Sequence, residues 1–196
     1  MPRAPAKKKP VRAPLAADAI LEAALAILDA EGFDRLTVRR LSAELGVSPM
    51  ALYWHVDGKA ALLGRLVDHV VGAYGVTDHP RDDPRAFLQE TFRRMRQGLV
   101  DHPGLLPLIA RPDGVGTHAH AVMHDVLGVL RGVGLSTRAS FDAYFLLASF
   151  TIGSVTVDHA ATTTGAPGRR GDAFDRGIAR LVDLVLPKAR GRRRAA

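Results

Sequence analysis

The chain of 196 residues contains no cysteine, and aromatic residues make up only 6% of it. The absence of cysteine excludes disulfide bonds and thiolate metal sites, and it suits the reducing environment of the cytoplasm. No uninterrupted apolar run approaches the ~20 residues that a membrane-spanning helix needs, so we expect no membrane partner. The basic N-terminus lacks a following hydrophobic stretch with a cleavage site, and we therefore expect no export signal.

The sequence also lacks the motifs of common enzyme classes. It has no glycine-rich phosphate loop, no nucleophile elbow and no carboxylate pair in a distinctive setting. His120 and His124 have a spacing that can hold zinc on one helix face, but no convincing third ligand accompanies them. We therefore expect no catalytic residue, no metal and no cofactor. A helical metal-dependent enzyme is the alternative, and it would require metal bound at stoichiometric levels.

The formal net charge of +7 resides at the two ends of the chain. Residues 1–14 and 187–196 hold ten of the 27 basic residues and no acidic residue, which leaves 17 basic against 20 acidic residues elsewhere. Both ends are rich in proline, alanine or glycine, so we expect a disordered basic arm and a basic tail. Such ends either add phosphate contacts on DNA or serve as solubilising extensions, and both interpretations stay open.

The remainder of the chain shows the 3.6-residue periodicity of helices, and no β pattern competes with it. A polar break at 77–84 separates a short N-terminal part from a longer C-terminal part. The expected domains are a helix-turn-helix domain at 15–60 and a helical body at 61–186. The expected helices span residues 15–30, 59–74, 85–101, 104–110, 117–133, 137–161 and 172–186.

The segment from Leu36 to Lys59 has the pattern of a helix-turn-helix. Thr37 is placed to cap the first helix, and Gly46 stands where the chain must turn sharply. Ser48 is a suitable N-cap for the second helix, and Pro49 then occupies its first position. This arrangement is typical of proteins whose second helix enters the DNA major groove. On spacing alone, an ordinary corner between two helices is the alternative.

This segment strongly resembles the tetracycline-repressor (TetR) family of bacterial transcription regulators, and the resemblance covers residues 15–75. Ser42 departs from the family pattern by replacing an alanine, which is a small-for-small change. The residues that match the pattern of the founding repressor are Leu36, Thr37, Arg39, Leu41, Leu45, Gly46, Val47, Leu52, Tyr53, Trp54, His55, Val56, Lys59, Leu62 and Leu63.

The resemblance implies an all-α protein with an N-terminal three-helix DNA-binding head. A linking helix would join this head to a C-terminal helical body that binds a ligand and dimerises. The expected function is a ligand-responsive repressor that binds a palindromic operator as a homodimer and is released by a small, mostly apolar effector. The alternative is a constitutive DNA-binding protein without an effector, whose DNA affinity would not change across a broad metabolite screen.

The resemblance also assigns the DNA contacts. Arg39 matches an arginine that reaches guanine, and a guanidinium group can pair with both O6 and N7 of that base. Pro49, Met50 and Ala51 replace polar residues at the start of the recognition helix, so the operator must differ from that of the founding repressor. Trp54 is expected to anchor the core of the head. The expected DNA-binding residues are Thr37, Arg39, Ser48, Pro49, Met50, Ala51, Tyr53, His55 and Lys59.

The body is expected to hold the dimer seam and the effector pocket. Gly75, Thr91, Met95 and Pro107 fall where the founding repressor contacts tetracycline and magnesium, so that ligand is not expected here. The expected seam comprises Phe141, Phe145, Ala148, Ile152 and Val155 on one helix and Ile178, Val182 and Val185 on another. The expected effector-binding residues are Thr91, Phe92, Met95, Leu106, Met123, His124, Leu127, Tyr144 and Phe145.

Overall fold

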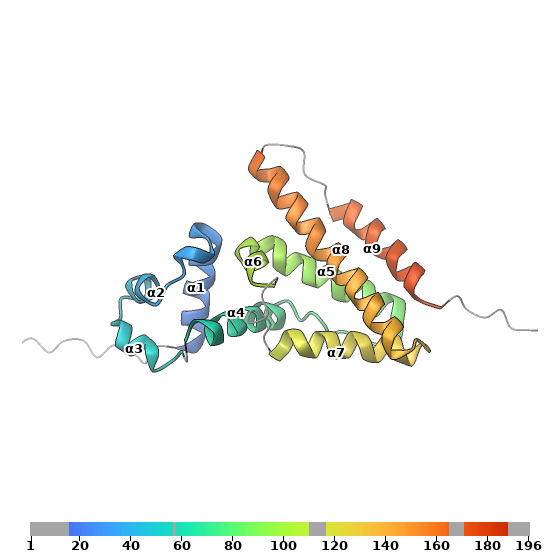
Figure 1. Cartoon of the computed structure of the whole chain (residues 1–196), viewed down its shortest axis with the longest axis horizontal. Helices are drawn as coiled ribbons and strands as arrows, with labels where there is room; N and C mark the ends of the chain where they lie inside the picture. The colour runs from blue at the N-terminus through green and yellow to red at the C-terminus, as the bar shows by residue number, and fades with distance from the viewer. Residues whose placement is uncertain (1–15, 57, 110–116, 165–170, 188–196) are drawn as a thin grey trace, which may run out of the picture.

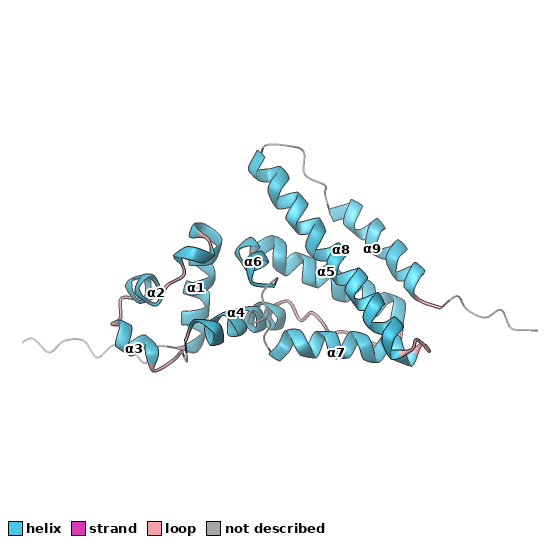
Figure 2. Ribbon diagram, in the orientation of Figure 1, coloured by secondary structure: helices cyan, strands magenta, loops and turns pink. Residues whose placement is uncertain are grey.

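The computed structural model describes residues 16–56, 58–109, 117–164 and 171–187. Within these ranges the chain forms helices joined by turns and loops, and none of the described residues lies in a strand (Figure 2). The all-α fold class is therefore confirmed. The predicted basic arm lies outside the described residues, as does the tail beyond Pro187.

The N-terminal helices form a head, from which one helix leads into the body (Figure 1). The expected short helix at 104–110 is divided into a 3₁₀ turn and α6, and the 3₁₀ turn after α1 was not predicted. The elements are α1 (Ala17–Glu31), η1 (Phe33–Arg35), α2 (Val38–Leu45), α3 (Pro49–Tyr53), α4 (Lys59–Ala73), α5 (Pro84–Asp101), η2 (Pro103–Leu105), α6 (Leu106–Ile109), α7 (Thr117–Gly132), α8 (Thr137–Thr164) and α9 (Gly171–Val185).

Two hydrophobic cores hold the molecule together. The first begins with α1 and α2 in the head, follows α4, and continues to Leu99, Leu105, Leu108 and Val155 in the body. The second fills the space between α5, α7, α8 and α9 and contains Phe87, Phe92, Leu130, Leu147, Phe174, Ile178 and Val182. Because α4 is buried in the same core as α1 and Leu105, the head and the body are joined by packing as well as by the chain.

A second junction between head and body lies at η2, beside α1. The Asp29 carboxylate accepts a hydrogen bond from the backbone N–H of Gly104 (3.1 Å) and contacts Nδ1 of His102 (2.8 Å). A Cβ atom at Gly104 would lie 2.6 Å from the backbone carbonyl carbon and oxygen of Leu28. Only glycine therefore lets η2 approach α1 this closely.

Helix α8 carries several exposed apolar side chains. By length and composition alone, Thr137–Thr162 could cross a membrane, and 33% of its most apolar window is buried inside the protein. Asp158 on this stretch pairs with Arg96 of α5 at 2.6 Å, and α8 packs against α5, α7 and α9. Its exposed apolar side chains, together with one on α9, are Phe141, Phe145, Leu146, Val157 and Leu184.

The predicted dimer seam is wrong for three residues. Val155, Ile178 and Val182 are 2% exposed or less, because they face the cores of the protomer itself. Phe141 and Phe145 are exposed, as a seam requires. We define the α8–α9 patch as the exposed residues Phe141, Phe145, Leu146, Val157 and Leu184.

Candidate DNA interface and effector cavity

The local geometry of the helix-turn-helix confirms the predicted caps. Thr37 Oγ1 accepts from the backbone N–H of Arg40 (3.1 Å), and Ser48 Oγ accepts from that of Ala51 (3.2 Å). Gly46 has φ 62° and ψ 32°, a left-handed conformation that glycine adopts without strain. The Val47 N–H then donates to Ser42 O (3.0 Å), which closes the turn. These bonds fix the angle between α2 and α3.

A groove of about 390 Å³ lies on the head between α2, α3 and the start of α4. Four of the predicted DNA-binding residues line it: Thr37, Arg39, Tyr53 and Lys59. Lys59 is the first residue of α4, and its Nζ lies 4.2 Å from the centre of the Phe33 ring. The groove therefore gathers hydroxyl, guanidinium and ammonium donors at the start of a helix, which suits a phosphate group.

The other predicted DNA-binding residues lie next to this groove along the chain. Pro49 and Met50 begin α3, and the side chain of Met50 is 70% exposed. His55 follows α3 and is exposed, whereas Ala51 is partly buried. Ser48 uses its hydroxyl for the cap. An α3 of only five residues thus presents an apolar leading end.

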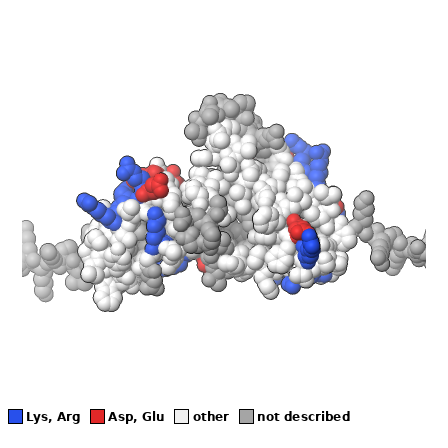
Figure 3. Space-filling model, in the orientation of Figure 1, with Lys and Arg blue, Asp and Glu red and all other residues white. Residues whose placement is uncertain are grey.

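Two adjacent arginines on α2 have different environments. Arg40 is bound by Glu31 (2.6 Å) and Glu44 (2.7 Å), and these hydrogen bonds raise the pKa of the Arg40 guanidinium. Arg39 is exposed, and its side chain has no hydrogen-bond or ion-pair partner within the part of the chain that the structure describes. Basic side chains project from the head, some of them beside acidic ones (Figure 3). Arg39 is therefore available to a ligand, whereas Arg40 is committed to the head.

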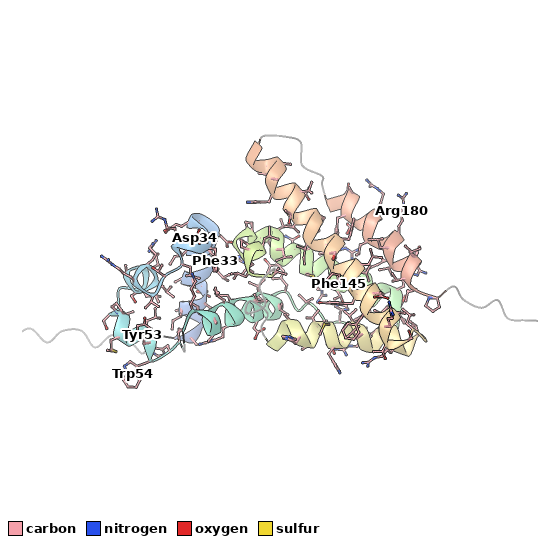
Figure 4. All side chains as sticks on the ribbon, in the orientation of Figure 1. Phe33, Asp34, Tyr53, Trp54, Phe145 and Arg180 are labelled. Atoms are coloured by element: carbon pink, nitrogen blue, oxygen red, sulfur yellow. The ribbon has the colours of Figure 1, made fainter. Side chains whose placement is uncertain are left out.

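Trp54 does not anchor the core of the head, and that prediction is wrong. Its side chain is 84% exposed and lies with Tyr53 at the outer end of the head (Figure 4). Leu52 and Val56 take the inward positions instead. Helix α3 is short, and Leu52 and Val56 are the residues here that face the core. The rings of Tyr53 and Trp54, which lie between them in the sequence, therefore turn outward.

A cavity of about 430 Å³ lies in the body, with walls from α4, α5, η2, α6, α7 and α8. Four of the nine predicted effector-binding residues line it: Met95, Met123, Tyr144 and Phe145. Most of the wall was not predicted, because periodicity marks these residues as apolar or buried without showing which of them border a cavity. The missed residues are Val67, Val70, Val71, Tyr74, Val76, Arg94, Gly98, Leu99, Leu105, Ile109, Ala119, His120, Val122, Ala148, Ser149 and Ile152.

The other five predicted effector residues are not part of this wall. Thr91 and Phe92 are fully buried on another face of α5, where Thr91 Oγ1 contacts His79 Nε2 (3.2 Å). Leu127 is buried within the body, and Leu106 packs against the first core. His124 is exposed on α7.

Comparisons with known proteins agree with this geometry. The model of the "Bacterial regulatory proteins, tetR family" matches residues 20–66. The model of the "Tetracyclin repressor-like, C-terminal domain" matches residues 77–187. The chain belongs to the tetR family. Its members are DNA-binding transcriptional regulators and not enzymes, and the predicted family, regulator class and absence of enzymatic activity are thereby confirmed.

Two curated repressors are among the proteins similar to this chain. The chain is 32% identical over 158 residues to the transcriptional repressor DrrR1 of Streptomyces coeruleorubidus, covering 75% of this chain and 56% of DrrR1. It is 31% identical over 166 residues to the class A tetracycline repressor of Escherichia coli, covering 80% and 72%. The chain therefore spans little more than half the length of DrrR1.

The solved structure of BioQ superposes with a TM-score of 0.72 at 27% identity, covering 88% of this chain and 99% of that one. BioQ bound to its double-stranded DNA operator gives a TM-score of 0.67, covering 87% and 98%. Most of this chain, head and body together, therefore has the fold of a protein whose structure on its DNA operator has been solved.

Proposed function

We propose that this tetR-family chain is a cytoplasmic repressor that binds a palindromic operator as a homodimer and is released by a small, mostly apolar effector. One observation carries the proposal: α4 lines both candidate sites. Its first residues, Lys59 and Leu62, border the groove of the head, and Val67, Val70 and Val71 line the cavity of the body. A ligand in the cavity therefore contacts the helix that holds the DNA-facing groove.

The release mechanism follows from differential affinity. A ligand that binds better to a different tilt of α4 shifts the population toward that tilt and moves Lys59 and the head with it. A hundredfold loss of DNA affinity needs a coupling free energy of about 2.7 kcal/mol. Residues of α1 and α4 and Leu105 belong to one hydrophobic core, so a shift of α4 would be felt in both the head and the body.

The α8–α9 patch supports the homodimer. Phe145 and Leu184 are 74% and 73% exposed, which is unusual for side chains of this size on a lone protomer. In a homodimer with a two-fold axis through the patch, the patch of one protomer would be buried against the patch of the other. The two heads would then be related by the same two-fold axis as the half-sites of a palindromic operator.

We also propose which segment of the chain performs each function. Residues 15–60 would bind DNA, and residues 61–186 would bind the effector and form the dimer. The ends at 1–14 and 187–196 would either add contacts to phosphates or serve as solubilising extensions. Thr37, Tyr53, His55 and Lys59 would hold the DNA backbone, Arg39 would pair with a guanine, and Ser48, Pro49, Met50 and Ala51 would form the surface that meets the bases.

Replacing Arg39 with alanine tests the base contact. On a duplex selected by the native protein from a random-sequence pool, Arg39→Ala is expected to weaken binding by about 1–3 kcal/mol and to relax the preference at one base pair. Lys59→Ala is expected to weaken selected and random duplexes alike, because a phosphate contact carries no sequence information. Fluorescence anisotropy with both duplexes at several salt concentrations measures the two effects.

The neighbouring arginine supplies the matched control. Arg40→Ala removes the same charge from α2, but Arg40 is occupied by Glu31 and Glu44, so the base preference is expected to stay unchanged. If Arg39→Ala lowers the affinity for selected and random duplexes equally, Arg39 does not read a base. If no duplex is enriched from the pool at all, the proposed operator binding is wrong.

A further inference from the structure

The walls of the body cavity contain few charged or titratable side chains. Among the described residues that line it there is no aspartate, glutamate or lysine, and its only side chains of basic type are Arg94 and His120. His120 is an exposed residue of α7. Apart from the hydroxyl group of Ser149, most of the remaining wall is aliphatic or aromatic, with Met95 on α5 and Met123 on α7. Flexible thioethers and ring faces adapt to flat apolar ligands.

Arg94 is committed to the protein and not to a ligand. Its Nε donates to Glu90 (2.7 Å), and its Nη1 donates to the carbonyl oxygens of Gly75 (2.8 Å) and Asp78 (3.3 Å). The hydrogen bond from Arg94 lowers the pKa of Glu90, so that carboxylate stays ionised and balances the guanidinium. An anionic ligand would therefore meet a cation that is already neutralised, and it would lose its own hydration on entry.

The two tyrosines of the cavity differ in what their hydroxyl groups do. Tyr74 donates to Asp101 Oδ2 at 2.6 Å, and burial together with this bond raises the pKa of Tyr74 to about 12. The Tyr144 hydroxyl has no hydrogen-bond partner in the described part of the chain, and burial raises the pKa of Tyr144 as well. Tyr144 therefore keeps its proton at neutral pH and has a donor to offer.

We propose that the effector of this chain is an uncharged, ring-containing molecule whose single essential polar group is a carbonyl-type oxygen that accepts a hydrogen bond from Tyr144. This rests on the proposed function and specifies its ligand class. The cavity of about 430 Å³ falls within the size range of sites for small organic molecules. A cationic ligand finds no carboxylate in the described wall, and metal chelates find no ligand set there.

Four probes built on one ring system test the charge and the acceptor separately. They are 9-fluorenone, fluorene without the carbonyl oxygen, 9-fluorenone-2-carboxylate, and 2-(aminomethyl)-9-fluorenone as the cation. Calorimetric titration of the DNA-free protein is expected to show 9-fluorenone binding at least ~10-fold tighter than either charged probe, since burying an unpaired charge is costly. It is expected to bind ~2–10-fold tighter than fluorene, the net worth of one hydrogen bond.

Two matched tyrosine variants locate the donor. Tyr144→Phe is expected to abolish the difference between 9-fluorenone and fluorene, while leaving the affinity for fluorene unchanged. Tyr74→Phe removes a hydroxyl that is already bonded to Asp101, so it is expected to preserve that difference. Because the measurement is a ratio within each variant, a general change in cavity packing cancels.

The outcomes separate the ligand class from the proposed function. Tighter binding of a charged probe, or binding of none of the four, overturns the inference and leaves operator binding untouched. An unchanged ratio in Tyr144→Phe overturns the role of Tyr144. If 9-fluorenone binds as expected but does not release the selected duplex in an anisotropy competition, the ligand class stands and the release mechanism fails.

Discussion

Leu184→Glu is expected to dissociate the homodimer and to lower affinity for the operator at least ~100-fold, because one head then binds without the effective concentration supplied by the second. Leu184 is 73% exposed on α9 and belongs to the α8–α9 patch, so a carboxylate there would be buried without a partner in the dimer. Light scattering gives the oligomeric state, and anisotropy on the selected duplex gives the affinity.

Val100→Glu is the control for that substitution. Val100 is also an exposed apolar residue, but it lies near the end of α5, outside the α8–α9 patch. It is expected to leave the dimer and the operator affinity unchanged. Because the Leu184 side chain is exposed on the protomer, Leu184→Glu is expected to keep its helical circular dichroism. A Leu184→Glu protein that remains dimeric would show that the seam lies elsewhere.

Gly104→Ala is expected to lower the free energy of unfolding by about 1–3 kcal/mol and to weaken operator binding. The new methyl group would lie 2.6 Å from the backbone of Leu28, which cannot move aside as a side-chain tip can. The head and η2 must then separate, which strains the hydrogen bond from Gly104 to Asp29 and displaces Leu105 from the wall of the cavity. Urea denaturation and anisotropy measure the two effects.

Gly128→Ala is the control with the same chemical change, and it is expected to raise the free energy of unfolding rather than lower it. Gly128 lies within α7, and apart from its chain neighbours and the backbone of its own helix, nothing lies within 4 Å of the added Cβ. Alanine there is expected to raise the free energy of unfolding by about 0.5–1 kcal/mol, because it restricts the unfolded chain and favours the helix. If both variants behave alike, the close approach of η2 to α1 does not hold the head against the body.

The helix-turn-helix could be predicted because its signals are local. Thr37, Gly46 and Ser48 act on the backbone within four residues of themselves, so their types and spacing determine the caps and the turn. Trp54 could not be placed in this way. The direction of the Trp54 ring depends on how Leu52 and Val56 pack against α1 and α4. That packing involves residues far apart in the sequence, so local patterns do not determine it.

The effector cavity was only partly predictable for a related reason. Helix α5 is apolar on more than one face, and periodicity shows that Phe92 and Met95 are both buried or half-buried without showing which one borders a cavity. The same holds for Ile178 and Val182, whose regular spacing fits a dimer seam as well as a protomer core. Tertiary packing assigned them to the core.

Footprinting on the DNA upstream of the gene that encodes this chain tests the central claim most directly. A homodimer with two heads on one palindrome predicts two protected patches on one face of the duplex, related by a two-fold axis and separated by about one helical turn of 34–36 Å or a multiple of it. Both patches should vanish together in Leu184→Glu. Uniform protection along the fragment, or a single patch without an inverted repeat, would contradict the account.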